Sequence, residues 1–378
     1  MFDRCRRWCV VAILSTVAPL GSHAQKPVAG DAPANPGPLA TGLVTTLHSK
    51  DIRPVLRKVA DWQLARLGSD PTPHSWDWGM LDLGLMAAYH TLGDKRYPDY
   101  VISQAGAANW HIDHTTTPAN DYAFAQALAD ASGGNARLMS AVRLRLDGDL
   151  EDKFDPEHAI WSRADALFFE APAVTQIAAI TDDDIYLAFV HREWHRTEKL
   201  LYSPEANLFA ANPASVGARE PNGQPRFEAR ANGMAIAGLV RVLASLPSDD
   251  PLRPAYVARL GQMAAALAQA QQPDGLWRPA LLDPASTPQP DVAASSLVVY
   301  ALAWGISHRH LDPRLYLPVV ERAWAGLLAH VYEDGRLGAI PPPDAAVAPT
   351  PGSSWNYGVG AFLLAGGEVD ALSLHKHW

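Results

Sequence analysis

The stretch Leu92-Gly93-Asp94-Lys95-Arg96-Tyr97 separates two segments that both carry the apolar periodicity of a helix. Before it, apolar residues recur at spacings of three and four over residues 81–92, which places them on one helix face. After it, Val101 continues an apolar pattern. A joint rich in Gly and Asp between two apolar helices is typical of a helical hairpin, so this stretch predicts two helices joined by a tight turn.

Comparable joints recur along the chain at intervals of roughly 40 to 70 residues, while strand-like alternation is scarce. One hairpin cannot bury its apolar face alone, so stacked copies are required, either as an open solenoid or as a closed ring. About six such hairpins, together with 12 Trp, favour the ring. The further joints are residues 132–135, 181–186, 248–251 and 311–313.

The composition indicates a large buried core and excludes some classes of function. Of the 378 residues, 48% are apolar, so a generally disordered chain is excluded. The net charge is −9, whereas phosphate binding needs a basic surface, so no nucleic-acid partner is predicted. Indole rings in a cleft stack well on sugars, although most Trp rings fill ordinary cores.

The N-terminal residues have the pattern of an export signal. Three arginines precede the apolar run 10–14, and Ser22-His23-Ala24 resembles a cleavage site. We therefore predict a signal peptide over residues 1–24, a flexible Pro/Ala-rich linker over 25–44 and a barrel domain over 45–378. Both cysteines fall inside the signal. The expected product is a periplasmic or secreted protein without disulfides, and without membrane attachment after cleavage.

Two carboxylates are candidates for catalysis. Asp121 and Asp165 each stand at the start of an apolar helical run. Hydrolysis of a glycosidic or enol-ether bond needs a positioned proton donor, and a carboxyl group beside the rings of Phe168-Phe169 suits that role. The alternative is structural, because Ser162 and Asp165 resemble a capping box and Asp121 can offset a helix dipole. Spacing alone leaves both interpretations open.

The segment 226–233 offers groups for binding. The planar fork of Arg230 suits a carboxylate, and Asn232 can hydrogen-bond sugar hydroxyls. The structural alternative is a solvated arginine and an Asn-Gly turn before the next helix.

Signatures of several other sites are missing: GxSxG, a phosphate loop and HExxH. The stretch His111-Ile112-Asp113-His114, like the pair His375 and His377, is better explained as a solvated polar segment than as metal ligands. No metal and no cofactor are therefore predicted.

The stretches Asp274-Gly275-Leu276-Trp277-Arg278-Pro279 and Asp334-Gly335-Arg336-Leu337-Gly338, with segments 161–172, 230–247 and 300–306, carry a specific resemblance when taken together. From about residue 50 to 370, this sequence resembles the unsaturated rhamnogalacturonyl hydrolases of glycoside hydrolase family 105 and the related unsaturated glucuronyl hydrolases of family 88. The resemblance implies an all-α (α/α)6 barrel. It also implies hydrolysis of oligosaccharides that end in a 4,5-unsaturated uronic acid, such as those derived from pectin, with no metal.

The resemblance also implies roles for individual residues. Asp165 matches the acid/base that protonates the ring double bond, and Asp121 matches a second Asp near the reacting ring. Arg230 matches the Arg of a Trp-x-Arg-Gly-Asn-Gly-Trp motif. The full set of candidate substrate-binding residues is Arg230, Asn232, Arg163, Trp161 and Glu228.

The chain departs from the family pattern at several of these positions. Glu228 and Met234 replace the two Trp of the motif, Ala231 replaces its first Gly, Arg163 replaces a Trp before the acid, and Ala211 replaces a His. Glu228 adds a negative charge that opposes an anionic substrate unless arginines neutralise it. Two alternatives to the leading function therefore stay open: a barrel hydrolase of another glycan, and a sugar-binding protein with a degenerate pocket.

Overall fold

The computed structural model describes residues 37–67, 75–107, 118–135, 139–152, 159–343 and 349–374. Within these residues the regular secondary structure is almost entirely helical, with one two-stranded antiparallel hairpin. The helices are α1 Ser49–Arg66, α2 Trp76–Leu92, α3 Arg96–Ala107, α4 Pro118–Ala131, α5 Ser140–Asp152, α6 Ala166–Thr181, α7 Asp184–Leu201, α8 Ala229–Ser245, α9 Arg253–Ala270, α10 Val292–Ser307, α11 Pro313–Leu328 and α12 Asn356–Leu374, and the strands are β1 Tyr202–Ser203 and β2 Leu208–Phe209.

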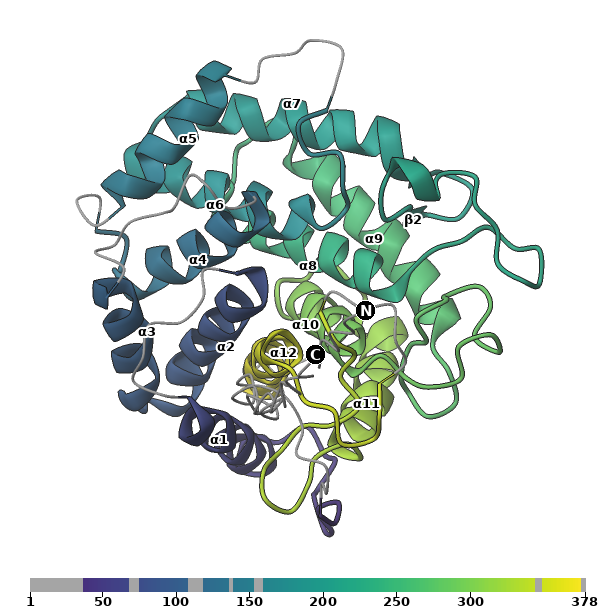
Figure 1. Ribbon diagram of the computed structural model, residues 1–378. Coiled ribbons are helices and arrows are strands. Elements are labelled where there is room, and N and C mark those ends of the chain that lie inside the picture. The colour runs from purple at the N-terminus through teal and green to yellow at the C-terminus, as the bar shows by residue number, and fades with distance from the viewer. Residues whose placement is uncertain are drawn as a thin grey trace, which may run out of the picture.

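The helices form two concentric rings, which confirms the predicted (α/α)6 barrel (Figure 1). Helices α2, α4, α6, α8, α10 and α12 make the inner ring, each packed against the next, and the remaining helices lie outside them. Burial follows this arrangement: α10 is buried continuously over residues 292–306, whereas α11 buries only one face. A helix that is apolar all round must be covered on every side, and an amphipathic one can face solvent.

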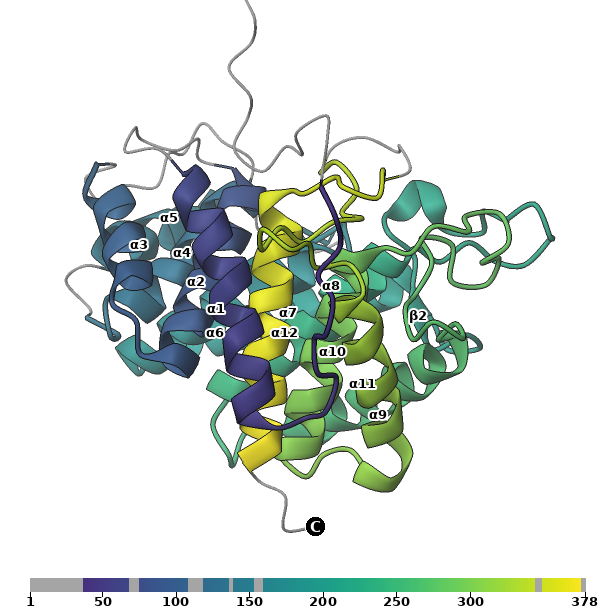
Figure 2. The same ribbon diagram turned by 90° about the horizontal axis from the view of Figure 1, so that it is seen from below.

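The joints predicted from the sequence connect each inner helix to the following outer helix. Gly93 ends α2 in the left-handed conformation at φ 71°, which glycine adopts without steric cost. Asp183 begins α7 by accepting a hydrogen bond from the backbone N–H of Ile185, and Asp312 does the same for Arg314 in α11. These short joints lie at one end of the barrel, and the longer connections lie at the other (Figure 2).

The ring is closed by its two chain ends. Helix α1 packs against α12, and Arg53 binds Asp370 across this contact at 2.9 Å. The helix pair α1 and α12, which completes the barrel, therefore joins segments from the two ends of the chain, and the two residues of this ion pair are 317 positions apart in sequence. Local periodicity carries no signal for such a pairing.

Small residues allow the inner helices to approach closely. A Cβ at Gly238 of α8 would collide with the backbone carbonyl of Leu167 in α6, and Gly84 of α2 faces Gly360 of α12 in the same way. Side chains at these positions would push the helices apart, so the glycines determine the diameter of the inner ring.

The predicted signal peptide and most of the predicted linker lie outside the described residues. At the described end of the linker, the backbone N–H of Ala40 donates to the carbonyl of Val331 at 2.9 Å, and that of Glu333 donates to Pro38 at 3.0 Å. Residues 38–40 are therefore attached to the barrel. Among the described residues, no helix combines the length and the apolar character that a bilayer crossing requires.

Candidate functional site

The predicted site residues converge on one end of the barrel because the inner helices begin there. Asp165 directly precedes α6, Asp121 lies in the first turn of α4, and Arg230 lies in the first turn of α8. This is the end that carries the long connections, at the top of Figure 2. Helix N-termini also favour negatively charged groups, so the barrel end suits carboxylates of the protein or of a ligand.

Asp165 is held by an arginine rather than by the helix that it precedes. Its side chain makes no capping hydrogen bond, and its backbone has helical angles, φ −68° and ψ −24°. Nε of Arg163 donates to both carboxylate oxygens at 3.1 Å, and Nη2 donates to Oδ2 at 2.8 Å. The structural alternative of a capping box is therefore not realised, and the carboxylate is partly exposed, at 24% of its side-chain surface.

Asp121 occupies a different environment. It is fully buried, and its Oδ2 accepts from Nε of Arg145 in α5 at 3.1 Å. Arg145 is itself buried and lies over the ring of Tyr122. A buried carboxylate with a charged partner is fixed in place, which suits a positioning role better than direct proton transfer. Sequence reasoning missed Arg145, because its contact with Asp121 depends on how α4 and α5 pack, which the local sequence does not specify.

A cavity of about 430 Å³ opens at the same end of the barrel, and neither Asp165 nor Asp121 is among the residues that line it. Glu228 and Arg230 line it, together with Arg226 and Asp291, which the sequence did not single out. Its walls also include prolines from the loops before α10 and α12, namely Pro279, Pro288, Pro341 and Pro349. The cavity therefore combines charged groups with rigid apolar surface, as sugar-binding clefts require.

Arg230 is fixed at the edge of this cavity. Its Nη1 donates to the backbone carbonyl of Pro343 at 2.9 Å, and its guanidinium lies 5.9 Å from the ring centre of Tyr357. The neighbouring Asp291 caps α10 by accepting from the N–H of Ala294 at 2.9 Å. Burial raises the pKa of Asp291, while the positive charge of Arg230 opposes that rise. Like Asp165, Asp291 stands just before an apolar run, so the same sequence criterion could have found it.

The negative charge of Glu228 is balanced by arginines. Arg226 lies 3.5 Å from Glu228, and Glu228 also acts electrostatically on Arg163 and Arg230. The pKa of Arg163 is raised above its ordinary value, mainly by its hydrogen bonds to Asp165. Three guanidinium groups therefore act on Glu228, while Glu220 and Asp291 add two further carboxyl groups to the lining of the same cavity.

Two predicted substrate-binding residues are structural instead. The ring of Trp161 is buried and packs edge-on against Phe189 at 5.6 Å, so it presents no face to a sugar. Asn232 is also fully buried. Its Oδ1 accepts from the N–H of Phe209 at 2.8 Å, and its Nδ2 donates to the carbonyls of Phe209 and Glu228 at 3.0 Å. Asn232 therefore attaches β2 to α8, and in this structure neither side chain is presented to a ligand.

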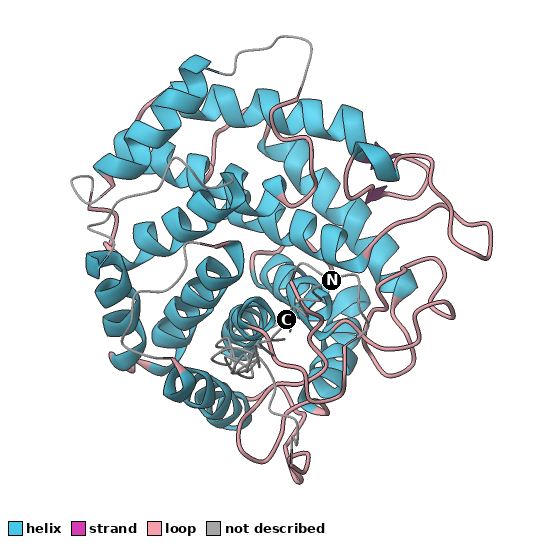
Figure 3. Cartoon of the chain, viewed as in Figure 1, coloured by secondary structure: helices cyan, strands magenta, loops and turns pink. Residues whose placement is uncertain are grey.

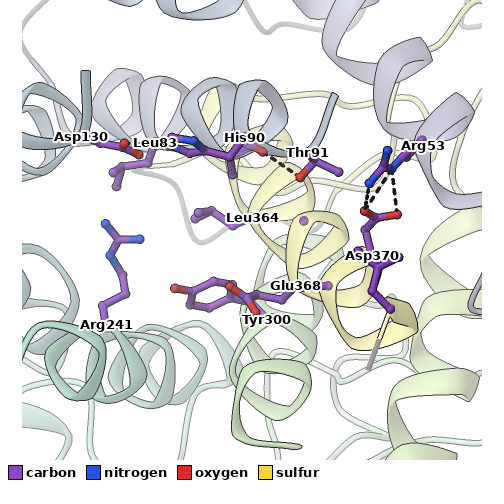
Figure 4. A pocket seen from close by; sticks show the side chains of 14 residues that line it. Arg53, Leu83, His90, Thr91, Asp130, Arg241, Tyr300, Leu364, Glu368 and Asp370 are labelled. Carbon is purple, nitrogen blue, oxygen red and sulfur yellow. Dashed lines mark hydrogen bonds and ion pairs between the residues drawn. The ribbon is translucent and has the colours of Figure 1, made fainter. Parts of the chain in front are cut away.

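A second cavity, of about 380 Å³, lies at the opposite end of the barrel (Figure 4). His90, Asp130, Arg241, Tyr300 and Glu368 line it, and burial raises the pKa of Glu368 to about 7. None of the predicted catalytic or binding residues lines this cavity. The helix C-termini that surround it disfavour anions, so the first cavity is the better candidate for an acidic sugar.

The two His-containing segments considered as metal ligands, 111–114 and 375–377, lie outside the described residues. Within the described part of the chain, no group of three or more His, Cys, Asp or Glu residues is arranged to hold a metal ion.

Helices make up nearly all of the regular structure and form concentric rings of hairpins (Figure 3). With carboxylates and arginines around a cavity at the N-terminal end of the inner ring, this fold defines an (α/α)-barrel enzyme that acts on carbohydrate. A family model described as Glycosyl Hydrolase Family 88 matches residues 51–372. The chain belongs to this family and is a glycoside hydrolase.

Individual relatives agree with this assignment. The chain is 30% identical to the unsaturated 3S-rhamnoglycuronyl hydrolase of Formosa agariphila, over 85% of this chain and 91% of that protein. A solved structure of a family 88 glycosyl hydrolase from Bacteroides vulgatus matches with a TM-score of 0.80 at 26% identity, covering 86% of this chain and 99% of that one. A structure described as a polysaccharide lyase matches with a TM-score of 0.81 at 28% identity, covering 87% and 99%.

Proposed function

We propose that this enzyme hydrolyses oligosaccharides that end in a 4,5-unsaturated uronic acid, with rhamnose as the favoured neighbouring sugar. The observation that carries the proposal is the pairing of Asp165 with Arg163, which also interacts electrostatically with Glu228 in the wall of a cavity that contains two further arginines. A carboxyl group supplies a proton, and guanidinium groups bind a uronate. The Formosa relative, named for a rhamnoglycuronyl substrate, supports the choice of sugar.

In the proposed reaction, Asp165 protonates the ring double bond and assists the addition of water. The resulting hemiketal opens and releases the neighbouring sugar. Asp121, held by Arg145, keeps the start of α4 and its own negative charge in a constant position near the reacting ring. This chemistry differs from the displacement that ordinary glycosidases perform with two carboxylates.

The test follows the ultraviolet absorbance of the conjugated double bond across a panel of lyase-generated oligosaccharides. Wild type should remove this absorbance. Asp165→Asn should slow its loss by about 10² to 10⁴-fold, the usual contribution of general acid–base catalysis. Stability should change little, because Asp165 makes no capping bond. The matched control is Asp94→Asn, since Asp94 also pairs with an arginine two residues away but lies at the joint after α2.

The same measurement separates the alternatives. A lyase creates the conjugated double bond, so an absorbance that rises on intact polysaccharide would replace the proposal by the reaction that the lyase-like structure suggests. Binding without any change in absorbance would indicate a sugar-binding protein. Equal rates for wild type and Asp165→Asn would remove Asp165 from the mechanism.

We also propose that the protein is exported, on the basis of the N-terminal pattern. Cell fractionation and N-terminal sequencing of the mature chain test this directly. An intact N-terminus in the cytoplasm would contradict it.

A further inference from the structure

The proton donor of the proposed reaction is neutralised by its own neighbour. Both oxygens of Asp165 accept hydrogen bonds from Arg163, at distances between 2.8 and 3.1 Å. A guanidinium in this bidentate position stabilises a charged carboxylate, and a charged carboxylate has no proton to donate. In the free enzyme, Arg163 thus occupies both oxygens of the proposed acid, through which a proton would be transferred.

The pair is placed so that it can be exchanged. The side chain of Arg163 is 59% exposed and that of Asp165 is 24% exposed. Ion pairs with this much solvent contact contribute little stability, so a competing anion can displace one partner at low cost. The buried pair of Arg145 and Asp121, with exposures of 9% and 0%, lacks this freedom.

The substrate of the proposed function brings a competing anion. We propose that Arg163 is a carboxylate-exchange residue, whose guanidinium passes from Asp165 to the uronate carboxylate when substrate binds. This inference rests on the proposed function and adds how the acid becomes active. Once the guanidinium has moved, both oxygens of Asp165 are free to carry a proton to the substrate, and the guanidinium holds the uronate carboxylate beside them.

The reaction then proceeds by protonation and hydration of the ring double bond. Asp165 gives its proton to C4 of the ring double bond, and positive charge develops at C5, where the ring oxygen stabilises it. The oxygen of a water molecule bonds to C5, and the proton lost by that water returns to Asp165. The exchange makes activation of the acid conditional on a carboxylate in the substrate.

The test compares an unsaturated glucuronyl-rhamnose disaccharide with its methyl ester, which has no charge to exchange. Wild type should hydrolyse the free-acid form of the disaccharide (the acid substrate) faster than the methyl ester. In Arg163→Gln, kcat/KM for the acid substrate should fall by about 10- to 100-fold, the contribution of a charge-assisted bidentate contact. The ester should be hydrolysed as fast as by wild type or faster, because Asp165 is no longer neutralised. Arg163→Lys should retain part of the preference, since it keeps the charge but loses the fork.

Arg96→Gln is the matched control. Arg96 binds Asp94 in the same bidentate manner, two residues apart, and is 55% exposed, but it lies at the opposite end of the barrel. It should change neither rate. A purely structural role for Arg163 predicts that Arg163→Gln slows the acid and the ester by the same factor, and that result would overturn the exchange. If wild type leaves both substrates and the wider oligosaccharide panel intact, the proposed function itself fails.

Discussion

Replacement of Asn232 by alanine is expected to destabilise the fold and to leave substrate affinity nearly unchanged. The side chain has no exposed surface and makes three hydrogen bonds to backbone groups. Alanine would leave the N–H and the carbonyl of Phe209 without these partners in a buried position. Each buried polar group that loses its partner costs about 1 to 3 kcal/mol, so the two together cost about 2 to 6 kcal/mol.

Asn222 provides a control of the same residue type. Its side chain also bonds backbone groups, accepting from the N–H of Gln224 at 2.9 Å and donating to the carbonyl of Leu282 at 2.8 Å, but it is exposed. Water can replace those bonds, so Asn222→Ala should cost less than about 1 kcal/mol.

The assay is urea unfolding of the three proteins, combined with KM for an unsaturated disaccharide at a temperature where all remain folded. Asn232→Ala should lower the unfolding midpoint strongly and leave KM within about twofold of wild type. An unchanged midpoint together with a KM raised many-fold would refute this reasoning. Asn232 would then bind sugar, as the sequence first suggested.

Two further predictions test the packing and the electrostatics of the inner ring. Gly238→Ala should lower the free energy of unfolding by about 1 to 3 kcal/mol, because its Cβ meets the Leu167 carbonyl. The control Gly261→Ala in α9 meets nothing within 4 Å and should raise the free energy of unfolding by about 0.5 to 1 kcal/mol. Equal urea unfolding midpoints for the two variants would contradict the close approach of α6 and α8. Burial raises the pKa of Asp82 from 3.8 to about 8, so between these values the folded protein holds a proton that the unfolded chain has lost, and stability falls as the pH rises through that window. Asp82→Asn should remove this loss and be more stable than wild type at pH 8 by several kcal/mol, and an identical pH dependence of unfolding in both proteins would contradict the assignment.

The sequence determined the elements of the barrel because its signals are local. The joint at 92–97 became a left-handed glycine between two helices, and the aspartates before α7 and α11 became caps. A cap or a tight turn depends on backbone groups within about four residues, so neighbouring side chains specify it. The same locality places Asp121, Asp165 and Arg230 at helix starts, and a ring of hairpins brings helix starts to one end.

The direction and the partner of each side chain were decided only by the tertiary structure. Asn232 and Trp161 have the residue types of a sugar site, yet the packing of α8 against β2 and of residue 161 against α7 turns both inward. The pairings of Asp121 with Arg145 and of α1 with α12 join elements whose relative position depends on closure of the whole ring. Burial and long-range contact are properties of the assembled barrel, because they arise from every helix at once and from no single stretch of sequence.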